Sequence, residues 1–318
     1  MRRPYRKGRL PVGDGHELYY EGWGNPKGVP IVSLHGGPGG GFTDRTKRLF
    51  DPRRHNLVLF DQRGAGRSRP FASVRANTTA HLVRDTDKVM DLFGLERAVL
   101  TGGSWGTTLA LAYALSRPRR VAGLVLCSLF LGDADAIRHY IGGGLRTHFP
   151  DRWERFLSLV PARHRRNPSA YYLSRMRSKD PRVSERYCYE WAYYEMSVVS
   201  LDVPHETVLK YMKEFSYRSL APLEAHYMAN GCFLPRGHIL KNARRLSRVP
   251  TALLHGRYDV ICPPVQAWEF KRRHGNVDLS FYPGGHYEEG PERKAAFKKA
   301  LAGVAAASGL AGRAAANR

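Results

Sequence analysis

Short apolar runs recur along the chain, and each ends in a glycine-rich or polar turn. They lie at 29–36, 56–64, 97–105, 121–128, 251–259 and 277–285, with a further strand expected at 18–23. Apolar runs of this length predict strands buried on both faces of a mostly parallel sheet. Helical patterns follow at 78–93, 105–116 and 264–273. The alternation predicts an α/β fold with a doubly wound, mostly parallel sheet.

The alternation breaks between residues 134 and 237. This segment is rich in Tyr, Arg and helix-forming residues and has no run of the strand type. Stretches such as WERFLSLV and YCYEWAYYEM are typical of amphipathic helices that close over an apolar space. We therefore expect a core domain formed by 1–133 and 238–318 and an inserted helical cap at 134–237. The alanine-rich C-terminus is expected to finish a last helix and to fray beyond Gly309.

The composition indicates a soluble globular protein. Of the 318 residues, 42% are hydrophobic and 25% are charged, and no apolar run reaches the roughly 18 residues that a membrane-spanning helix needs. The basic start MRRPYRKGRL is not followed by the apolar stretch of a signal peptide, which favours a cytoplasmic location. The four cysteines show no metal-ligand spacing and are expected to be free thiols.

The formal net charge of +23 is the unusual feature of the composition. Such a charge raises the possibility of nucleic acid or an anionic membrane as a partner. The basic residues are scattered, however, and the densest stretches, 163–166 and 241–248, are interrupted by His, Asn, Ala and Leu. We therefore expect no specific nucleic-acid partner and no membrane partner, and we attribute the charge to solvated surface or to a salty or acidic cell interior.

The segment GGSWG at 102–106 matches the pattern G-x-S-x-G. It stands between the apolar run AVLT and the helical run TTLALAYAL. A serine in that place lies on a sharp turn from strand to helix, with its hydroxyl clear of the sheet. This context predicts that Ser104 is a catalytic nucleophile.

A serine nucleophile needs a base, and in hydrolases with this turn the chain order is nucleophile, acid, histidine. Asp259 follows the run TALLHGRY and His286 follows DLSFYPGG, so both are expected at the carboxyl edge of the sheet beside Ser104. Asp133, after the run VAGLVLCS, is an alternative acid. Because Asp133 also stands where a cap helix begins, we interpret it as an N-cap and prefer Asp259.

The glycine-rich segment HGGPGGG at 35–41 directly follows an apolar run. Glycines at this point allow the backbone to approach a reacting carbonyl group closely. We predict that the amides of Gly37 and Trp105 form an oxyanion hole. His35 is expected to make structural hydrogen bonds, because it lies on the wrong loop for a catalytic base.

Several of these segments, in this order, resemble the proline iminopeptidases, also called prolyl aminopeptidases, of the α/β-hydrolase fold. The segments are HGGPGGG at His35, DQRGAGRSRP at Asp61, NTT at Asn77, GGSWGTTLALAYA at Gly102, GRYDVICP at Gly256 and GGH ending at His286. The resemblance implies release of N-terminal proline from short peptides through an acyl-enzyme on the serine, without a metal or an organic cofactor.

The same resemblance implies how the free amino terminus of a peptide is bound. Glu195 in WAYYEM and Glu224 in LEAHYMANGCFL fall in contexts similar to those of the family's cap carboxylates. A charged amine in a closed cavity must be paired, which agrees with such a role. The chain departs from many relatives at Tyr194 and Ala225, beside these two glutamates.

Other functions fit parts of the sequence. The same triad would serve an ester, a lactone or an N-acyl substrate. Dehalogenases and epoxide hydrolases of this fold use a carboxylate where this chain has Ser104. A non-catalytic basic binding protein is disfavoured because such proteins usually lose part of the triad, which is whole here.

Overall fold

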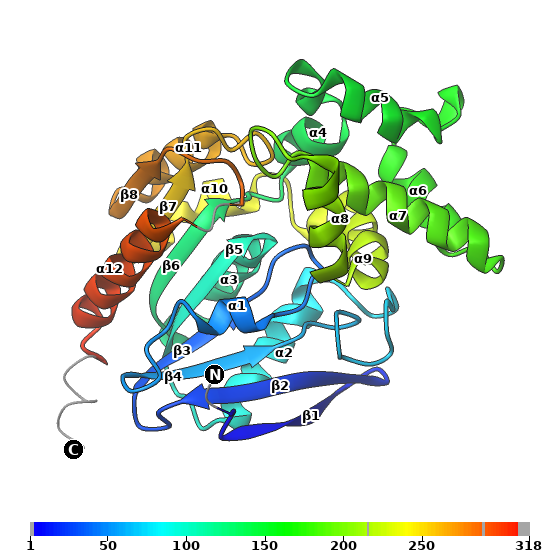
Figure 1. Cartoon of the computed structure of the whole chain (residues 1–318). Helices are drawn as coiled ribbons and strands as arrows, with labels where there is room; N and C mark the ends of the chain where they lie inside the picture. The colour runs from blue at the N-terminus through cyan, green and yellow to red at the C-terminus, as the bar shows by residue number, and fades with distance from the viewer. Residues whose placement is uncertain (1–2, 215, 288–289, 311–318) are drawn as a thin grey trace.

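An eight-stranded sheet forms the centre of the computed structural model, which describes residues 3–214, 216–287 and 290–310 (Figure 1). The strand order is β1-β2-β4-β3-β5-β6-β7-β8. β2 runs antiparallel to both β1 and β4, and the other neighbours are parallel. The strands are β1 (Arg6–Gly13), β2 (His16–Gly24), β3 (Val29–Leu34), β4 (His55–Phe60), β5 (Ala98–Ser104), β6 (Val121–Leu129), β7 (Thr251–Gly256) and β8 (Val277–Tyr282). The predicted fold class is confirmed.

Neighbouring residues of a strand point to opposite faces of the sheet. In the central strands both sets of side chains are apolar, so helices cover both faces. Val32 and Leu100 pack in the hydrophobic cluster that includes α2 and α3, whereas Ile31 and Val99 pack in the cluster that includes α12. The helices are α1 (Asp44–Lys47), α2 (Thr79–Leu92), α3 (Trp105–Ser116), α4 (Ala134–Ile141), α5 (Pro150–Ser158), α6 (Pro168–Met176), α7 (Pro181–Ser197), α8 (His205–Glu214), α9 (Tyr217–Ala229), α10 (His238–Asn242), α11 (Pro264–His274) and α12 (Pro291–Ala307).

The expected strands all form, and the sequence pattern missed one further strand, β1. Its sequence RKGRLPVG is basic and contains a proline, and most of its residues are exposed. This strand lies at the edge of the sheet and pairs only with β2. An edge strand needs no continuous apolar run, and it tolerates proline and charge, so the pattern of buried strands does not find it.

The segment between β6 and β7 is helical in its described residues and contains no strand. Figure 1 shows α4 to α7 projecting beyond the sheet, with α8 and α9 between them and the core. We refer to α4–α9 as the cap helices. α9 lies against the loop after β3, where Ser219 Oγ donates to the carbonyl of Gly39 at 2.9 Å.

Two further expectations concern the termini and the thiols. Fraying was predicted beyond Gly309, and of these residues 311–318 lie outside the described part of the chain. The cysteines are free and buried. Across the described part of the chain, no helix has the length and apolar character needed to cross a membrane.

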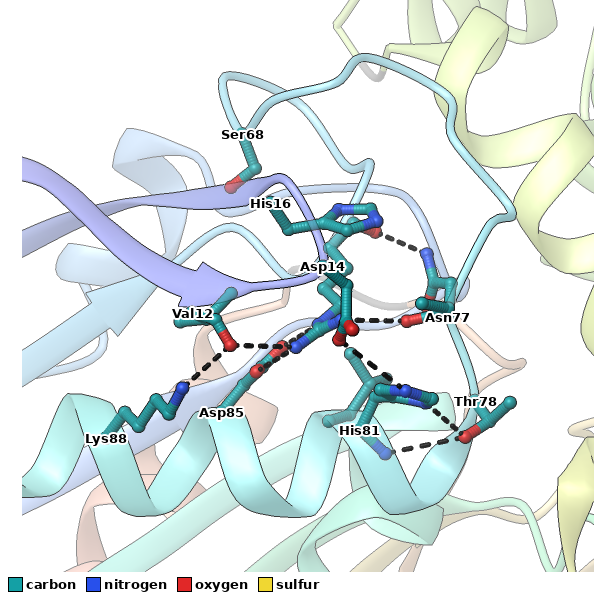
Figure 2. A network of polar contacts seen from close by, with 12 residues as sticks. Val12, Asp14, His16, Ser68, Asn77, Thr78, His81, Asp85 and Lys88 are labelled. Carbon is teal, nitrogen blue, oxygen red and sulfur yellow. Dashed lines mark hydrogen bonds and ion pairs between the residues drawn. The ribbon is translucent and has the colours of Figure 1, made fainter.

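A buried arginine joins the loop after β4 to the rest of the core. Arg63 donates through Nε and Nη2 to both carboxylate oxygens of Asp85 at 2.6 and 2.9 Å, and through Nη1 to Asp14 at 2.9 Å. Figure 2 shows Asp85 and Lys88 on α2 facing Val12 and Asp14 at the end of β1. A bidentate pair in the interior fixes geometry as well as charge. The network therefore holds the 61–77 loop, which contains DQRGAGRSRP, in one place.

Candidate active site

Ser104 lies at the turn where β5 ends and α3 begins. Its backbone has φ 54° and ψ −126°, a sparsely populated conformation for a residue other than glycine. The glycines around it are required by close packing, because a Cβ on Gly102 would lie 2.4 Å from the carbonyl oxygen of Gly106. A Cβ on Gly106 would lie 2.2 Å from the carbonyl oxygen of Leu34. The pattern G-x-S-x-G thus permits the tight turn that presents the serine.

The two predicted oxyanion donors are the amides of Gly37, on the glycine-rich loop after β3, and of Trp105. Trp105 is the first residue of α3, so its amide has no acceptor within the helix and carries the positive end of the helix dipole. Gly37 lines the same cavity as Ser104. A Cβ on Gly36 would lie 3.1 Å from the carbonyl oxygen of Gly103, which shows how closely the glycine-rich loop approaches the turn.

Asp259 and His286 meet at the same edge of the sheet. His286 Nδ1 lies 3.0 and 2.9 Å from the two carboxylate oxygens of Asp259, so it donates to this carboxylate and Nε2 is left as the acceptor. Burial opposes a charged imidazole, but the negative charge and hydrogen bond of Asp259 outweigh it and raise the pKa of His286. His286 lines the cavity that also contains Ser104. The structure therefore pairs Asp259 with His286 and places His286 and Ser104 on one cavity.

Asp133 does not take part in this arrangement. Its side chain accepts a hydrogen bond from the amide of Ala136 at 2.9 Å and caps the start of α4. The N-cap interpretation of Asp133 is thereby confirmed.

His35 and Gln62 link the glycine-rich loop at 35–41 to the loop after β4. His35 Nδ1 contacts the carbonyl of Gly36 at 2.9 Å, and its Nε2 accepts from the amide of Gln62 at 2.9 Å. Burial lowers the pKa of His35, which keeps it neutral. Gln62 also accepts from Trp105 Nε1 at 2.9 Å. His35 makes structural hydrogen bonds, as predicted. No role was predicted for Gln62, although it stands in the segment DQRGAGRSRP.

A second buried histidine, His255, supports the loop that carries Asp259. The sequence analysis assigned no role to this histidine. His255 Nδ1 accepts from the amide of Leu129 at 3.1 Å, and Nε2 donates to the carbonyl of Cys262 at 2.8 Å. The amide of Cys262 in turn donates to Asp259 at 2.8 Å. The histidine in TALLHGRYD is the signal that could have indicated this role.

The carboxyl groups of Glu195 on α7 and Glu224 on α9 lie close enough to interact, and Glu224 is buried whereas Glu195 is half-buried. Trp191 Nε1 donates to Glu224 Oε2 at 2.7 Å, while Glu195 Oε2 has no hydrogen-bond partner among the described residues. Burial raises the pKa of Glu195 to about 7. Burial and the neighbouring Glu195 raise the pKa of Glu224 well above its usual value. Near neutral pH, the pair therefore tends to share a proton.

The cavity that contains Ser104 has a volume of about 280 Å³. Glu195 and His286 line it, and so do the apolar side chains of Met196, Val199 and Leu220. Glu195 is near enough to His286 for its charge to contribute to the raised pKa of the imidazole. Ser104, His286 and Glu195 thus face one partly apolar space.

The same loops offer one group of potential metal ligands within the described part of the chain. One ligand atom from each of Asp259, Cys262 and His286 lies within 4.8 Å of the others. Metal binding by cysteine requires the thiolate, but burial raises the pKa of the Cys262 thiol well above its usual value. His286 already donates to Asp259. This chemistry favours a histidine–aspartate pair over a metal site.

Comparison with known proteins agrees with this geometry. The sequence model of a family described as alpha/beta hydrolase fold matches residues 29–287. The proline iminopeptidase of Xylella fastidiosa is 38% identical over 285 residues, which cover 89% of this chain and 91% of that protein. The proline iminopeptidase of Arabidopsis thaliana is 39% identical over 292 residues, covering 91% and 77% of the two chains.

A solved structure shows the same fold. The crystal structure of the Mycobacterium smegmatis proline iminopeptidase superposes with a TM-score of 0.60 and 21% identity, covering 98% of this chain and 100% of that chain. Together with the close sequence relatives, these findings show that the chain is a hydrolase and belongs to the proline iminopeptidase family of the α/β-hydrolase fold.

Proposed function

We propose that this enzyme releases N-terminal proline from short peptides through an acyl-enzyme on Ser104. The observation that carries the proposal is the pair of carboxyl groups of Glu195 and Glu224, of which Glu195 lines the cavity of Ser104 and His286. A buried carboxyl pair costs free energy unless a cation or a shared proton compensates it. A substrate ammonium group supplies that cation.

The chemistry of an N-terminal proline suits two carboxylates. A protonated prolyl nitrogen carries two N–H donors, whereas other N-terminal residues carry three. Glu195 and Glu224 can each accept one of the two prolyl donors, and a third donor would need a further acceptor in a closed site. Leaving a buried donor unpaired costs about 1–3 kcal/mol, which favours proline over a primary amine.

The proposed reaction begins when Ser104 Oγ attacks the prolyl carbonyl carbon and its proton passes to His286 Nε2. Asp259 stabilises the imidazolium through Nδ1, and the amides of Gly37 and Trp105 bind the oxyanion. His286 then gives the proton to the leaving amine, and the C–N bond breaks. Water then gives a proton to His286 and attacks the acyl carbon, the ester bond to Ser104 Oγ breaks, and His286 returns the proton to Oγ as proline is released.

The role of the glutamates is tested by Glu195→Gln and Glu224→Gln. Each variant keeps the side-chain size but removes a negative charge from the amine site. We expect kcat/KM for a prolyl arylamide to fall about 10- to 100-fold in each, the effect of losing a charge-assisted hydrogen bond of about 1.5–3 kcal/mol. Hydrolysis of 4-nitrophenyl acetate, which has no amine, should change less than threefold (~0.6 kcal/mol).

Glu190→Gln provides the matched control, because Glu190 lies on α7, the helix that carries Glu195. Glu190 pairs with Arg155 at 2.8 Å and does not line the cavity. This variant should hydrolyse the prolyl arylamide and 4-nitrophenyl acetate at the wild-type rates. An equal loss of amide and ester hydrolysis in the Glu195 and Glu224 variants would contradict the amine-binding role and favour an ester, lactone or N-acyl substrate.

The pH dependence of the two substrates should differ. His286 must be neutral to act as a base, and its pKa is raised, so both rates fall as the pH decreases into the range of that pKa. Binding of an ammonium group also requires an ionised carboxylate, and burial raises the pKa of Glu195 to about 7. Below pH 7, we therefore expect kcat/KM for the prolyl arylamide to fall more steeply than for the acetate ester. Superimposable pH profiles would contradict this expectation.

A further inference from the structure

The helix that carries Glu224 is attached to the core at both of its ends. At its start, Ser219 Oγ donates to the carbonyl of Gly39 at 2.9 Å and accepts from the amide of Gly66 at 3.2 Å. At its end, Tyr227 and His226 both bind Asn77 of the core. α9 is therefore located by the core loops after β3 and β4 as well as by the other cap helices.

Asn77 is the residue that makes the second attachment. Tyr227 Oη donates to Asn77 Oδ1 at 2.9 Å, and His226 Nε2 lies 2.9 Å from the Asn77 carbonyl. Asn77 Nδ2 donates to the carbonyls of Arg63 and Ser73 at 2.9 and 3.0 Å. Figure 2 shows Asn77 at the edge of the network around Asp14 and Asp85, which fixes this loop.

The same tyrosine reaches the nucleophile turn. The rings of Tyr227 and Trp105 are fully buried and pack edge to face, with centroids 4.7 Å apart. On its polar side, Trp105 Nε1 donates to Gln62 Oε1, and Gln62 stands on the loop that leads to Asn77. Tyr227 lies three residues after Glu224 on one helix, so a displacement of its ring and hydroxyl group would also move the carboxylate.

We propose that Asn77 and Tyr227 are positioning residues that set the distance between the Glu224 carboxylate and the Ser104–Trp105 turn. The proposal rests on the amine-binding role of Glu224 given above. Tyr227 has two separable parts: its hydroxyl group attaches α9 to Asn77, and its ring supports Trp105. Loss of the hydroxyl affects amine binding, whereas loss of the ring also affects the oxyanion hole.

Tyr227→Phe tests the first part, because it removes only the hydroxyl and keeps the ring against Trp105. We expect KM for a prolyl arylamide to rise about five- to tenfold with kcat within twofold, and 4-nitrophenyl acetate hydrolysis to stay within twofold, as expected for loss of one hydrogen bond that positions a binding group. Tyr227→Leu should lower kcat for both substrates as well. Equal effects of Tyr227→Phe on both substrates, or none on either, would overturn the proposal.

Tyr113→Phe is the matched control for the loss of a buried hydroxyl. Tyr113 is equally buried, and its hydroxyl donates to Asp87 at 2.8 Å in the core, away from the cap. This variant should lower the Tm without changing KM for the arylamide. An equal rise of KM in Tyr113→Phe would show that Tyr227→Phe acts through general stability and would overturn the proposal.

Asn77→Ala and the double variant Asn77→Ala/Tyr227→Phe complete the test. If both residues act through one hydrogen bond, the double variant has the same KM for the arylamide as Asn77→Ala, and additive effects contradict that link. Glu224→Gln separates the two proposals. If it loses amide and ester hydrolysis equally, the amine-binding role fails; if it is selective for the amide while Tyr227→Phe is not, only the positioning role fails.

Discussion

Replacing Ser104 with alanine should lower kcat for a prolyl arylamide by about 10⁴- to 10⁶-fold, the range found when a nucleophile is removed from a catalytic triad. The substitution removes the attacking oxygen, and the nearby Thr107 hydroxyl is bound to the carbonyl of residue 104. Alanine keeps the Cβ of serine, so the unusual backbone conformation with φ 54° is no more strained than before. Hydrolysis of 4-nitrophenyl acetate should be lost to a similar degree, because both substrates use the same nucleophile.

The measurement is steady-state hydrolysis of both substrates, with thermal unfolding as the check on folding. Ser33→Ala is a suitable control, because Ser33 lines the same cavity from β3 but has no part in the proposed reaction. We expect its rates to stay within a fewfold of wild type. A folded Ser104→Ala enzyme that kept more than about 1% of kcat would contradict the assignment of the nucleophile.

Asp259→Asn should lower kcat by about 10⁴-fold, as expected when the residue that orients a catalytic imidazole no longer selects its tautomer. The carboxylate accepts from both His286 Nδ1 and the amide of Cys262. If the asparagine oxygen accepts from Cys262, its NH₂ group faces Nδ1. That arrangement favours a proton on Nε2, and such an imidazole cannot accept the proton of Ser104.

The pH profile and a matched variant distinguish this explanation from misfolding. Without the carboxylate, the pKa of His286 should fall, because Asp259 contributes more than Glu195 to raising it. The remaining activity should therefore persist to lower pH than in wild type. Asp133→Asn keeps an N-cap side chain on α4 and should retain kcat within a fewfold. Loss of activity in Asp133→Asn but not in Asp259→Asn would make Asp133 the catalytic acid.

Local sequence predicts the parts of this fold that depend on local packing. The turn at Ser104 is predictable because the glycines needed for its close contacts stand beside the serine in the chain. The central strands are predictable because burial on both faces demands continuous apolar runs. β1 was missed for the same physical reason, since an edge strand with exposed, basic residues carries no such run.

The residues that support the site could not be assigned from local patterns. Gln62 binds Trp105, which is 43 positions away, and Asn77 binds Tyr227, which is 150 positions away. The first pair exists only after the core has folded, and the second only after the core and the cap have packed together. The segments DQRGAGRSRP and NTT were recognisable as family motifs, but their roles depend on contacts that span the chain.

The central claim is that the enzyme cleaves after a free N-terminal proline. It is tested most directly by wild-type kcat/KM on prolyl, alanyl and N-acetylprolyl arylamides, with Ser104→Ala as the blank. We expect the prolyl substrate to be cleaved fastest, the alanyl substrate to be slower by about tenfold or more (~1.4 kcal/mol), and acetylation of the amine to abolish cleavage. Equal cleavage of the prolyl and N-acetylprolyl substrates would contradict it.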